Sequence, residues 1–403
     1  MDTTVSLDPR ALDASDPLSR FRDRFVPTVP GVIYLDGNSL GRPAKASLER
    51  VAAIGEAWAQ RLIRGWDDGW LELPLTIGDL LANDILGARP GEVAVVDSTT
   101  VNLYRVAGAA LHARKSRRTV VIERSEFPTD RYVMEGLARE RDLEIRWLDG
   151  DPVEGLTTEQ VAQALDADTA LLILSAVNYR SAAIVDIKAV TDVARDAGAL
   201  VLWDLSHAAG SIPVRLETSG VDLAVGCTYK FLNGGPGAPA YLYVRRELQD
   251  ELTPPIQGWF AQREQFEMGP AFERRPGIGG WLVGTPPIIS LIAAQAGIEL
   301  VAETGIDAIR AKGIALSDYA IAMTDAWLAP LGCSVGSPRD STRRGGHVAI
   351  RHPEARRLTR QLIARKVIPD FRAPDSIRIG LSPLTTSFED VHGGLTAIRE
   401  LLA

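Results

Sequence analysis

Cysteine is scarce in this 403-residue chain, and its scarcity excludes several kinds of protein. Only Cys227 and Cys333 are present, so the chain has neither a disulfide framework nor the cysteine spacing of a metal site. No apolar run is long enough to span a membrane, and the first residues lack a basic-then-apolar signal pattern. We therefore expect a protein of the reducing cytoplasm that binds no metal.

The sequence also has no excess of basic charge and no nucleotide-binding motif. The formal net charge is −8, and no lysine or arginine stripe outweighs the acidic residues, which argues against nucleic-acid binding. The predicted helix Val101–His112 is opened by neither Gly-x-Gly-x-x-Gly nor Gly-Lys-Ser/Thr. The missing fingerprints exclude a nucleoside-triphosphate cup and argue against a nicotinamide oxidoreductase.

From residue 91 to residue 244, short apolar runs alternate with helical stretches. The predicted strands are Val93–Val96, Thr119–Glu123, Leu143–Leu148, Thr169–Ser175, Ala199–Leu205, Asp222–Cys227 and Ala240–Val244. This alternation predicts an α/β fold whose mostly parallel sheet is covered by helices on both faces. Near the C-terminus, strands at Gly346–Arg351 and Ser376–Leu381 flank a helix at Pro353–Lys366 and predict a smaller α+β domain.

Lys230 is the residue around which the other candidates are arranged. It follows a buried apolar run, Leu223–Cys227, and precedes a glycine-rich loop, and it is one of only six lysines against 38 arginines. A lysine at the end of a buried strand is costly unless it is paired, exposed or neutralised by chemistry. A Schiff base with an aldehyde cofactor supplies that chemistry, because it consumes the amine.

Polar residues at the ends of the neighbouring predicted strands belong to the same edge of the sheet, where ligands bind in open α/β sheets. Asp204 follows one buried strand, and His207 lies three residues further on. Alone, each is more often a cap, an ion-pair partner or a structural histidine. Beside a Schiff-base lysine, Asp204 can keep the nitrogen of a pyridine ring protonated, so that the ring withdraws electrons.

Hydroxyl groups and an arginine supply the remaining candidate contacts. Thr99 and Thr100 open a predicted helix, whose free N–H groups and positive dipole end favour a phosphate. At least one of the hydroxyl side chains at this helix start is explained as an N-cap. Asn38 and Ser39 lie in a polar loop. Arg378 alternates with apolar residues in the last predicted strand, and its guanidinium fork suits a carboxylate.

These motifs, taken in order, resemble the kynureninase family nearly from end to end. The matching stretches are YLDGNSLGRP (34–43), DSTTVNLY (97–104), EFPTDRYV (126–133), SAVNYRSA (175–182), WDLSHAAG (203–210), CTYKFLNGGPGAPA (227–240), GWF (258–260), RPGI with GTPP (275–287), RGGHVAIRHPEA (344–355) and DFRAPDSIRIGLSPL (370–384).

The resemblance implies the fold of pyridoxal phosphate (PLP)-dependent transferases of fold type I, in the class V aminotransferase group. We expect an N-terminal arm over residues 1–30, a large PLP-binding domain with a sheet of about seven strands over residues 31–300, and a small C-terminal domain over residues 301–403. It also implies a homodimer whose active sites are shared between subunits, and a small-molecule amino-acid substrate. From the composition we expect neither nucleic acid nor membrane as partner.

The resemblance also implies roles for individual residues. Lys230 is the Schiff-base lysine, and Tyr229 is an acid or base. Asp204 pairs with the ring nitrogen, and Arg378 binds the substrate α-carboxylate, with Asn38 and Ser39 nearby. The remaining cofactor contacts are Thr99, Thr100 and Tyr229 on the phosphate, joined by Trp259 and Thr285 of the partner subunit, with Phe127 stacked on the ring and Asp130, Ser175 and His207 around it.

The reaction implied is hydrolytic Cβ–Cγ cleavage of L-kynurenine, or of its 3-hydroxy derivative, to the anthranilate and L-alanine. The chain departs from the family at Ala261-Gln262, where Gly-His is usual, and at Thr385, where tyrosine is common. These departures leave the substrate open. The alternative is a kynureninase-like PLP lyase, or a class V aminotransferase, that acts on a different amino acid in a specialised pathway. A cysteine desulfurase is disfavoured, because Cys227 lies in a predicted buried strand and Cys333 lacks the flanking pattern of a nucleophilic cysteine.

Overall fold

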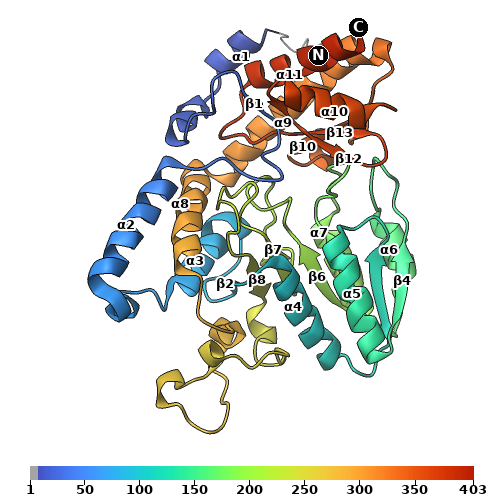
Figure 1. Ribbon diagram of the computed structural model, residues 1–403. Helices are drawn as coiled ribbons and strands as arrows, with labels where there is room; N and C mark the ends of the chain where they lie inside the picture. Colours follow the sequence, from blue (N-terminus) through green and yellow to red (C-terminus); the bar gives the residue numbers. More distant parts are fainter. Residues whose placement is uncertain (1–7) are drawn as a thin grey trace.

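A seven-stranded sheet forms the centre of the molecule, as a computed structural model of residues 8–403 shows (Figure 1). Its strand order is β2-β8-β7-β6-β5-β3-β4. The strands are β2 (Val93–Val95), β3 (Thr119–Glu123), β4 (Glu144–Leu148), β5 (Thr169–Ser175), β6 (Leu200–Asp204), β7 (Leu223–Gly226) and β8 (Tyr241–Val244). Strands β4, β3, β5, β6 and β7 run parallel, and β8 is antiparallel to both of its neighbours. The predicted, mostly parallel sheet is confirmed.

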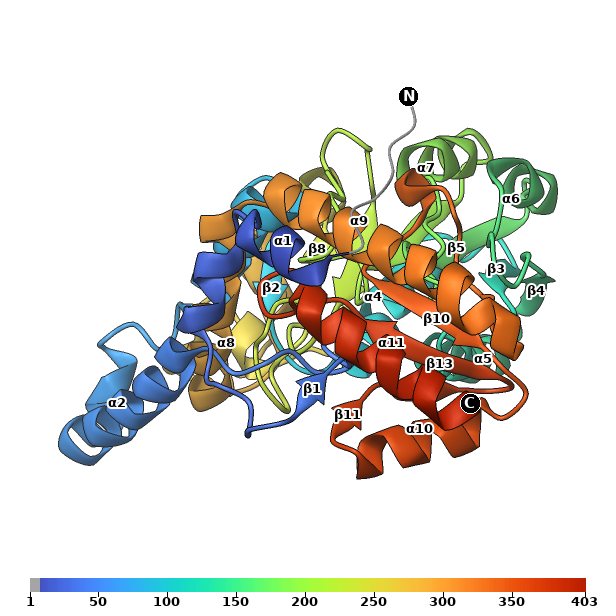
Figure 2. The ribbon, with the colours of Figure 1, turned by 90° about the horizontal axis from the view of Figure 1, so that it is seen from above.

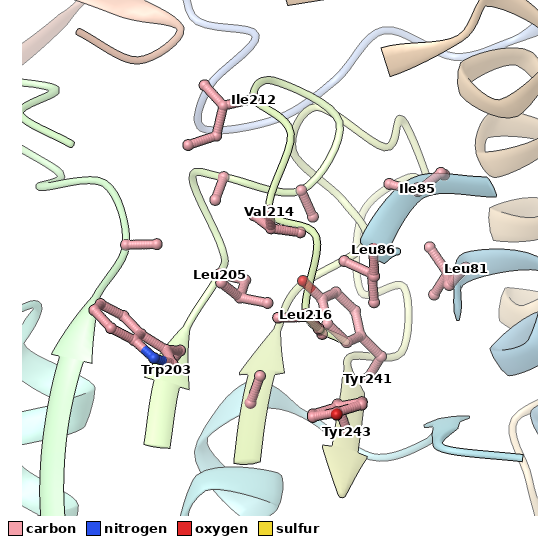
Figure 3. Packing of buried hydrophobic residues seen from close by; sticks show 14 of the residues in the cluster. Leu81, Ile85, Leu86, Trp203, Leu205, Ile212, Val214, Leu216, Tyr241 and Tyr243 are labelled. Atoms are coloured by element: carbon pink, nitrogen blue, oxygen red, sulfur yellow. The ribbon is translucent and has the colours of Figure 1, made fainter. Parts of the chain in front are cut away.

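Alternate residues of the central strands enter two separate cores, because side chains on a strand point to opposite faces. In β5, Leu172 and Leu174 belong to one cluster, and Leu171 and Ile173 belong to the other. The first core contains Trp203 of β6 and both tyrosines of β8, packed against side chains from outside the sheet (Figure 3). Burial of both faces explains why these strands read as continuous apolar runs.

Helices cover both faces of the sheet (Figures 1 and 2). They are α3 (Leu73–Leu81), α4 (Thr99–Ala113), α5 (Pro128–Arg141), α6 (Thr158–Ala164), α7 (Ile187–Asp196) and α8 (Ile288–Thr304), and α2 (Lys45–Arg61) packs on α8. Helix α2 projects to one side of the molecule (Figure 2), and the segment between Trp259 and Trp281 projects below the sheet in Figure 1.

A four-stranded antiparallel sheet, ordered β12-β13-β10-β9, lies above the carboxyl ends of the central strands in Figure 1. Its strands are β9 (Ser334–Val335), β10 (His347–Arg351), β12 (Asp370–Arg372) and β13 (Ser376–Gly380); its helices are α9 (Ile306–Met323), α10 (Ala355–Ala364) and α11 (Phe388–Leu402). These elements confirm the predicted α+β character. Strand β1 (Ile33–Tyr34) pairs with β11 (Val367–Ile368), and α1 (Pro9–Ala14) packs on α11. The predicted domain limits stay predictions, and residues 1–7 of the predicted arm lie outside the described residues.

Two features of residues 8–403 concern membrane spans and metal ligands. No single helix in this range is both long and apolar enough to cross a membrane; Ile288–Thr304 and Ile306–Leu331 meet the criterion only as a pair bent by 84°. Nor does this range contain a group of three histidine, cysteine, aspartate or glutamate side chains that could hold a metal ion.

Candidate active site

A cavity of about 490 Å³ lies at the carboxyl ends of β5, β6 and β7. Most of the predicted site residues line it: Ser39, Thr99, Thr100, Phe127, Ser175, Asp204, His207, Tyr229 and Lys230. Residues more than 190 positions apart in the chain therefore meet at the edge of the sheet where an open α/β fold binds its ligands.

Lys230 enters this cavity from a tight turn after β7. The N–H of Gly234 donates to the carbonyl of Thr228 (2.9 Å), and the N–H of Asn233 donates to that of Lys230 (2.9 Å). The Lys230 side chain is buried, and its Nζ lies 3.4 Å from Nε2 and 3.5 Å from Nδ1 of His207. No carboxylate of the described residues forms an ion pair with it. A buried amine without a counter-ion is costly, which favours a chemical role for it.

The loop after β1 presses against this turn. The N–H of Gly41 donates to the carbonyl of Tyr229 (2.8 Å). A Cβ atom at Gly41 would lie 2.3 Å from the Lys230 carbonyl oxygen and 2.4 Å from Asn233 Oδ1, so only glycine fits at this contact. The close approach brings Ser39 to the cavity wall.

The N-terminus of α4 forms another wall of the cavity. Ser98 is the N-cap and accepts a hydrogen bond from the N–H of Val101 (3.4 Å), so the hydroxyls of Thr99 and Thr100 are not needed for capping. Asp97, with φ +49°, turns the chain into the helix and binds the buried Arg105 at 2.6 Å. Free N–H groups, two hydroxyls and the helix dipole at this point can hold a phosphate.

Two carboxyl groups are buried at and behind the cavity wall. Asp204 ends β6 and accepts a hydrogen bond from the N–H of Ser206 (2.7 Å). Asp130 is fully buried, and neither of its oxygens has a hydrogen-bond partner among residues 8–403. Burial, followed by the charges of Asp204 and Glu126, raises the pKa of Asp130 well above its usual value. Asp130 lies behind Asp204, and Asp204 is the carboxyl group at the cavity that a cationic or N–H-bearing ligand would reach.

His207 and Tyr229, which flank Lys230, are held in their neutral forms. Burial, then the charge of Lys230, lowers the pKa of His207 well below its ordinary value. Burial also raises the pKa of Tyr229, so its phenol keeps its proton at neutral pH. Both side chains can therefore exchange hydrogen bonds with a ligand without adding charge to the cavity.

Arg378 lies in an adjoining cavity of about 170 Å³, which shares Lys230, His207 and Tyr229 with the larger one. Its side chain is fully buried. With its oxygen turned toward Arg378, the amide of the buried Asn38 accepts from Nε (2.9 Å) and Nη2 (3.1 Å), and Ser39 Oγ lies 2.9 Å from Nη2. The three residues predicted to bind the substrate therefore lie together, next to Lys230.

Trp259 and Thr285 lie outside both cavities of their own chain. Trp259 is 43% exposed and its indole N–H donates to the carbonyl of Gln265 (2.6 Å). Thr285 is exposed. The departures from the family pattern also lie outside the cavities: Gln262 lines a separate hollow in the projecting segment, and Thr385 is buried near Arg42.

Several residues of the site escape prediction from the sequence. Asp370, Arg372, Glu126 and His347 are the main ones. Tyr179 is predicted, because it follows β5 as Asp204 ends β6, and it lines both cavities. The other four depend on tertiary contacts that periodicity does not record. His347 of β10, for example, is fully buried, and the centroid of its ring is 5.7 Å from that of His207.

The residues present fit pyridoxal phosphate. Within residues 8–403, the cavity offers a buried amine without a counter-ion, a helix N-terminus with spare hydroxyls, and the buried carboxyl group of Asp204. These three features would bind, in turn, the aldehyde, the phosphate and the protonated ring nitrogen of the cofactor.

Comparisons with known proteins agree with this arrangement. The family model for the kynureninase C-terminal domain matches residues 309–398. Kynureninase of Burkholderia pseudomallei (strain 1106a) is 43% identical over 97% of this chain and 94% of its own length. Kynureninase of Pseudomonas fluorescens is 41% identical over 99% of this chain and 96% of its own length.

Solved structures share the fold at low sequence identity. A cysteine desulfurase of Thermococcus onnurineus NA1 superposes with a TM-score of 0.81 at 18% identity, covering 98% of each chain. A lysine-to-alanine mutant of C-DES, with glycine covalently linked to its PLP cofactor, superposes with a TM-score of 0.83 at 17% identity. This match covers 94% of this chain and 99% of the C-DES chain. The fold is that of PLP-dependent fold-type I enzymes, and the near-full-length relatives show that the chain belongs to the kynureninase family.

Proposed function

We propose that this protein cleaves the Cβ–Cγ bond of L-kynurenine, or of 3-hydroxykynurenine, by hydrolysis and releases the corresponding anthranilate and L-alanine. The observation that carries the proposal is the buried amine of Lys230. It has no counter-ion within residues 8–403 and lies in a cavity built from the motifs that relate the chain to kynureninases.

Pyridoxal phosphate would be held by side chains of the larger cavity. Thr99, Thr100 and the N-terminus of α4 would bind its phosphate, together with Tyr229. Phe127, whose ring centroid is 5.7 Å from Lys230 Nζ, would cover the ring. Asp204 would hold the proton of the ring nitrogen, with Asp130, Ser175 and His207 around it. When bound, the cofactor supplies an electron-withdrawing ring that stabilises negative charge on the substrate.

Lys230 and Tyr229 would move the protons. The Lys230 amine, once released from the cofactor aldehyde, is a base positioned to take the proton from the α-carbon of the substrate. Tyr229 keeps its proton at neutral pH, so it can pass a proton from the attacking water to the γ-carbonyl oxygen. It can then pass one from the hydrated carbonyl to Cβ as the Cβ–Cγ bond breaks and the aryl acid leaves. His207 is neutral and contacts Nζ, so it can orient the amine without repelling it.

The substrate α-carboxylate would bind Arg378, because a guanidinium fork matches a carboxylate in two hydrogen bonds. Asn38 and Ser39 already contact Nη2 of Arg378 and would fix its orientation. A carboxylate bound there brings the α-carbon toward Lys230, since both residues line the smaller cavity.

The active site would be completed by a second copy of the chain in a homodimer. Trp259 and Thr285 are exposed and lie outside the cavities of their own chain, although the family motif assigns them to the phosphate. The segment that carries Trp259 projects from the molecule (Figure 1). Two further aromatic side chains of this segment, Phe266 and Phe272, are exposed. Contact with a partner would bury these rings and bring Trp259 to the partner's cavity.

A desulfurase is the competing function that the shared fold raises. It needs a reactive thiolate, and both cysteines are unsuitable, because burial raises the pKa of Cys227 and raises that of Cys333 to about 11. Both thiols are free, which suits the reducing cytoplasm that we expect as the location.

Product analysis distinguishes the proposed hydrolysis from transamination. The purified holoenzyme would be incubated with L-kynurenine and, separately, with 3-hydroxykynurenine. We expect a fluorescent anthranilate and an equal amount of L-alanine from at least one of them. Transfer of the amino group to a keto acid without an anthranilate product would instead indicate an aminotransferase, and no aryl product from either substrate would refute the proposal.

A further inference from the structure

The guanidinium fork of Arg378, which the proposed function assigns to the substrate carboxylate, already holds a carboxylate of the chain itself. Asp370 Oδ1 accepts from Nε of Arg378 (2.9 Å), and Oδ2 accepts from Nη2 (2.5 Å). The strand register explains this pair, because Asp370 of β12 lies directly opposite Arg378 of β13. A substrate carboxylate and Asp370 cannot occupy the same fork, since their like charges repel each other and both need the same N–H groups.

Arg372 offers Asp370 a second position. It follows Asp370 by two residues on β12 and therefore extends from the same face of the strand. Its Nη2 already donates to Asp370 Oδ2 (2.6 Å), whereas its Nε is buried without a hydrogen-bond partner among residues 8–403. Arg372 thus makes one of the two hydrogen bonds of a bidentate pair with Asp370. A rotation of the Asp370 side chain would add the second, from Nε of Arg372.

Arg378 has contacts besides Asp370. Its Nη1 donates to the carbonyl of Tyr179 (2.5 Å), and the amide oxygen of Asn38 accepts from Nε and Nη2. Ser39 Oγ lies 2.9 Å from Nη2 and also donates to Asp370 Oδ2 (3.1 Å), so this hydroxyl is released when Asp370 turns away. Tyr179 and Asn38 would therefore keep the arginine in position at the wall of the smaller cavity.

We propose that Asp370 and Arg372 are positioning residues that make Arg378 available to the substrate. The α-carboxylate of the substrate replaces Asp370 on Arg378, and the Asp370 side chain turns to form a bidentate pair with Arg372. The exchange conserves the number of charge pairs, because each carboxylate ends on its own arginine. Before the substrate arrives, Asp370 neutralises Arg378 inside a cavity that also contains Lys230. The exchange selects ligands with an α-carboxylate, because an uncharged group gives Arg378 no replacement for Asp370.

The inference rests on the proposed PLP-dependent function, but its test does not require kynurenine. L-Alanine and L-alaninamide would be titrated into the holoenzyme while the absorption band of the cofactor is recorded. We expect Arg372→Gln to weaken alanine binding about tenfold, because Asp370 then keeps its place on Arg378. Adding Asp370→Asn to this variant should restore alanine binding to within about threefold of the wild type, while alaninamide binding stays unchanged throughout. Arg351→Gln, which removes another Arg–Asp pair of the same sheet outside both cavities, is the matched control and should change neither affinity.

Three results would overturn the inference. Alanine binding that is insensitive to Arg372→Gln would show that Asp370 needs no second arginine. A double variant no better than Arg372→Gln would mean that Arg372 binds the substrate itself or only supports the strand. Absence of any alanine response in the wild-type holoenzyme would remove the carboxylate site altogether. A holoenzyme that binds alanine as expected but forms no aryl product would refute only the proposed reaction.

Discussion

Glu126 accepts two hydrogen bonds from Ser175, one from its backbone N–H (2.6 Å) and one from its hydroxyl. The carboxyl group of Glu126 is buried beside the cavity, and burial, with the neighbouring charge of Glu123, raises its pKa to about 8. The folded protein therefore keeps a proton on Glu126 under conditions where the unfolded chain loses it. This linkage makes the contribution of Glu126 to stability depend on pH.

Replacing Glu126 by glutamine tests this linkage. Because the pKa is raised in the folded state, the stabilising contribution is present at low pH and is lost as the pH rises from about 4.5 toward 8, by at most about 1.4 kcal/mol per unit. Glutamine imitates the protonated acid at every pH. Thermal unfolding of both proteins should show the variant gaining on the wild type as the pH rises from 5 to 8. A constant difference between them would contradict the assigned pKa.

Asp204 is expected to act on the electronic state of the cofactor rather than on the fold. Asp204→Asn keeps an acceptor for the N–H of Ser206 but removes the negative charge. We expect kcat to fall by about 10²-fold or more, as for the loss of a preorganised electrostatic partner, with little change in melting temperature. Steady-state kinetics would measure this, with Asp192→Asn on the exposed surface of α7 as the control. Unchanged turnover in the Asp204 variant would exclude its proposed role.

Gly41→Ala should push the loop after β1 away from the turn that carries Lys230. The added methyl group would meet backbone and side-chain atoms at 2.3 to 2.8 Å, so we expect a loss of about 1–3 kcal/mol in the free energy of unfolding, together with weaker substrate binding. Gly136→Ala, in α5, meets nothing within 4 Å and should be neutral or slightly stabilising. Equal denaturant midpoints for the two variants would refute the steric argument.

Hybrid dimers test whether the site is shared between subunits. Lys230→Ala and Trp259→Ala should each be nearly inactive alone. In an equal mixture after subunit exchange, half of the dimers are hybrids with one intact site, so about a quarter of wild-type activity should return. A mixture as inactive as its components, with exchange verified by mass spectrometry, would place Trp259 outside the partner's site.

The positions of Lys230 and Asp204 follow from local sequence, because each comes just after an apolar run and parallel strands bring their carboxyl ends together. The strand order and the reversed direction of β8 depend on connections that periodicity does not record. The helix α11 is not predicted, although Ser387 and Asp390 form a capping box at its start. The Asp370–Arg378 pair could not be predicted, because it depends on the register of two short strands.

The exposure of Trp259 and Thr285 shows another limit. The motifs around them resemble the family, but a single chain does not bring them to the cavity. Contacts supplied by a second subunit leave no periodic pattern in the sequence.

The most direct test of the account is Lys230→Ala, compared with Lys188→Ala on the exposed surface of α7. Both proteins would be loaded with pyridoxal phosphate, treated with borohydride and digested for mass spectrometry. We expect the wild type and the Lys188 variant to carry the reduced cofactor on the peptide that contains Lys230 and to cleave kynurenine, whereas the Lys230 variant should carry none and lose activity. Full activity and labelling in the Lys230 variant would contradict the central claim that this amine binds the cofactor.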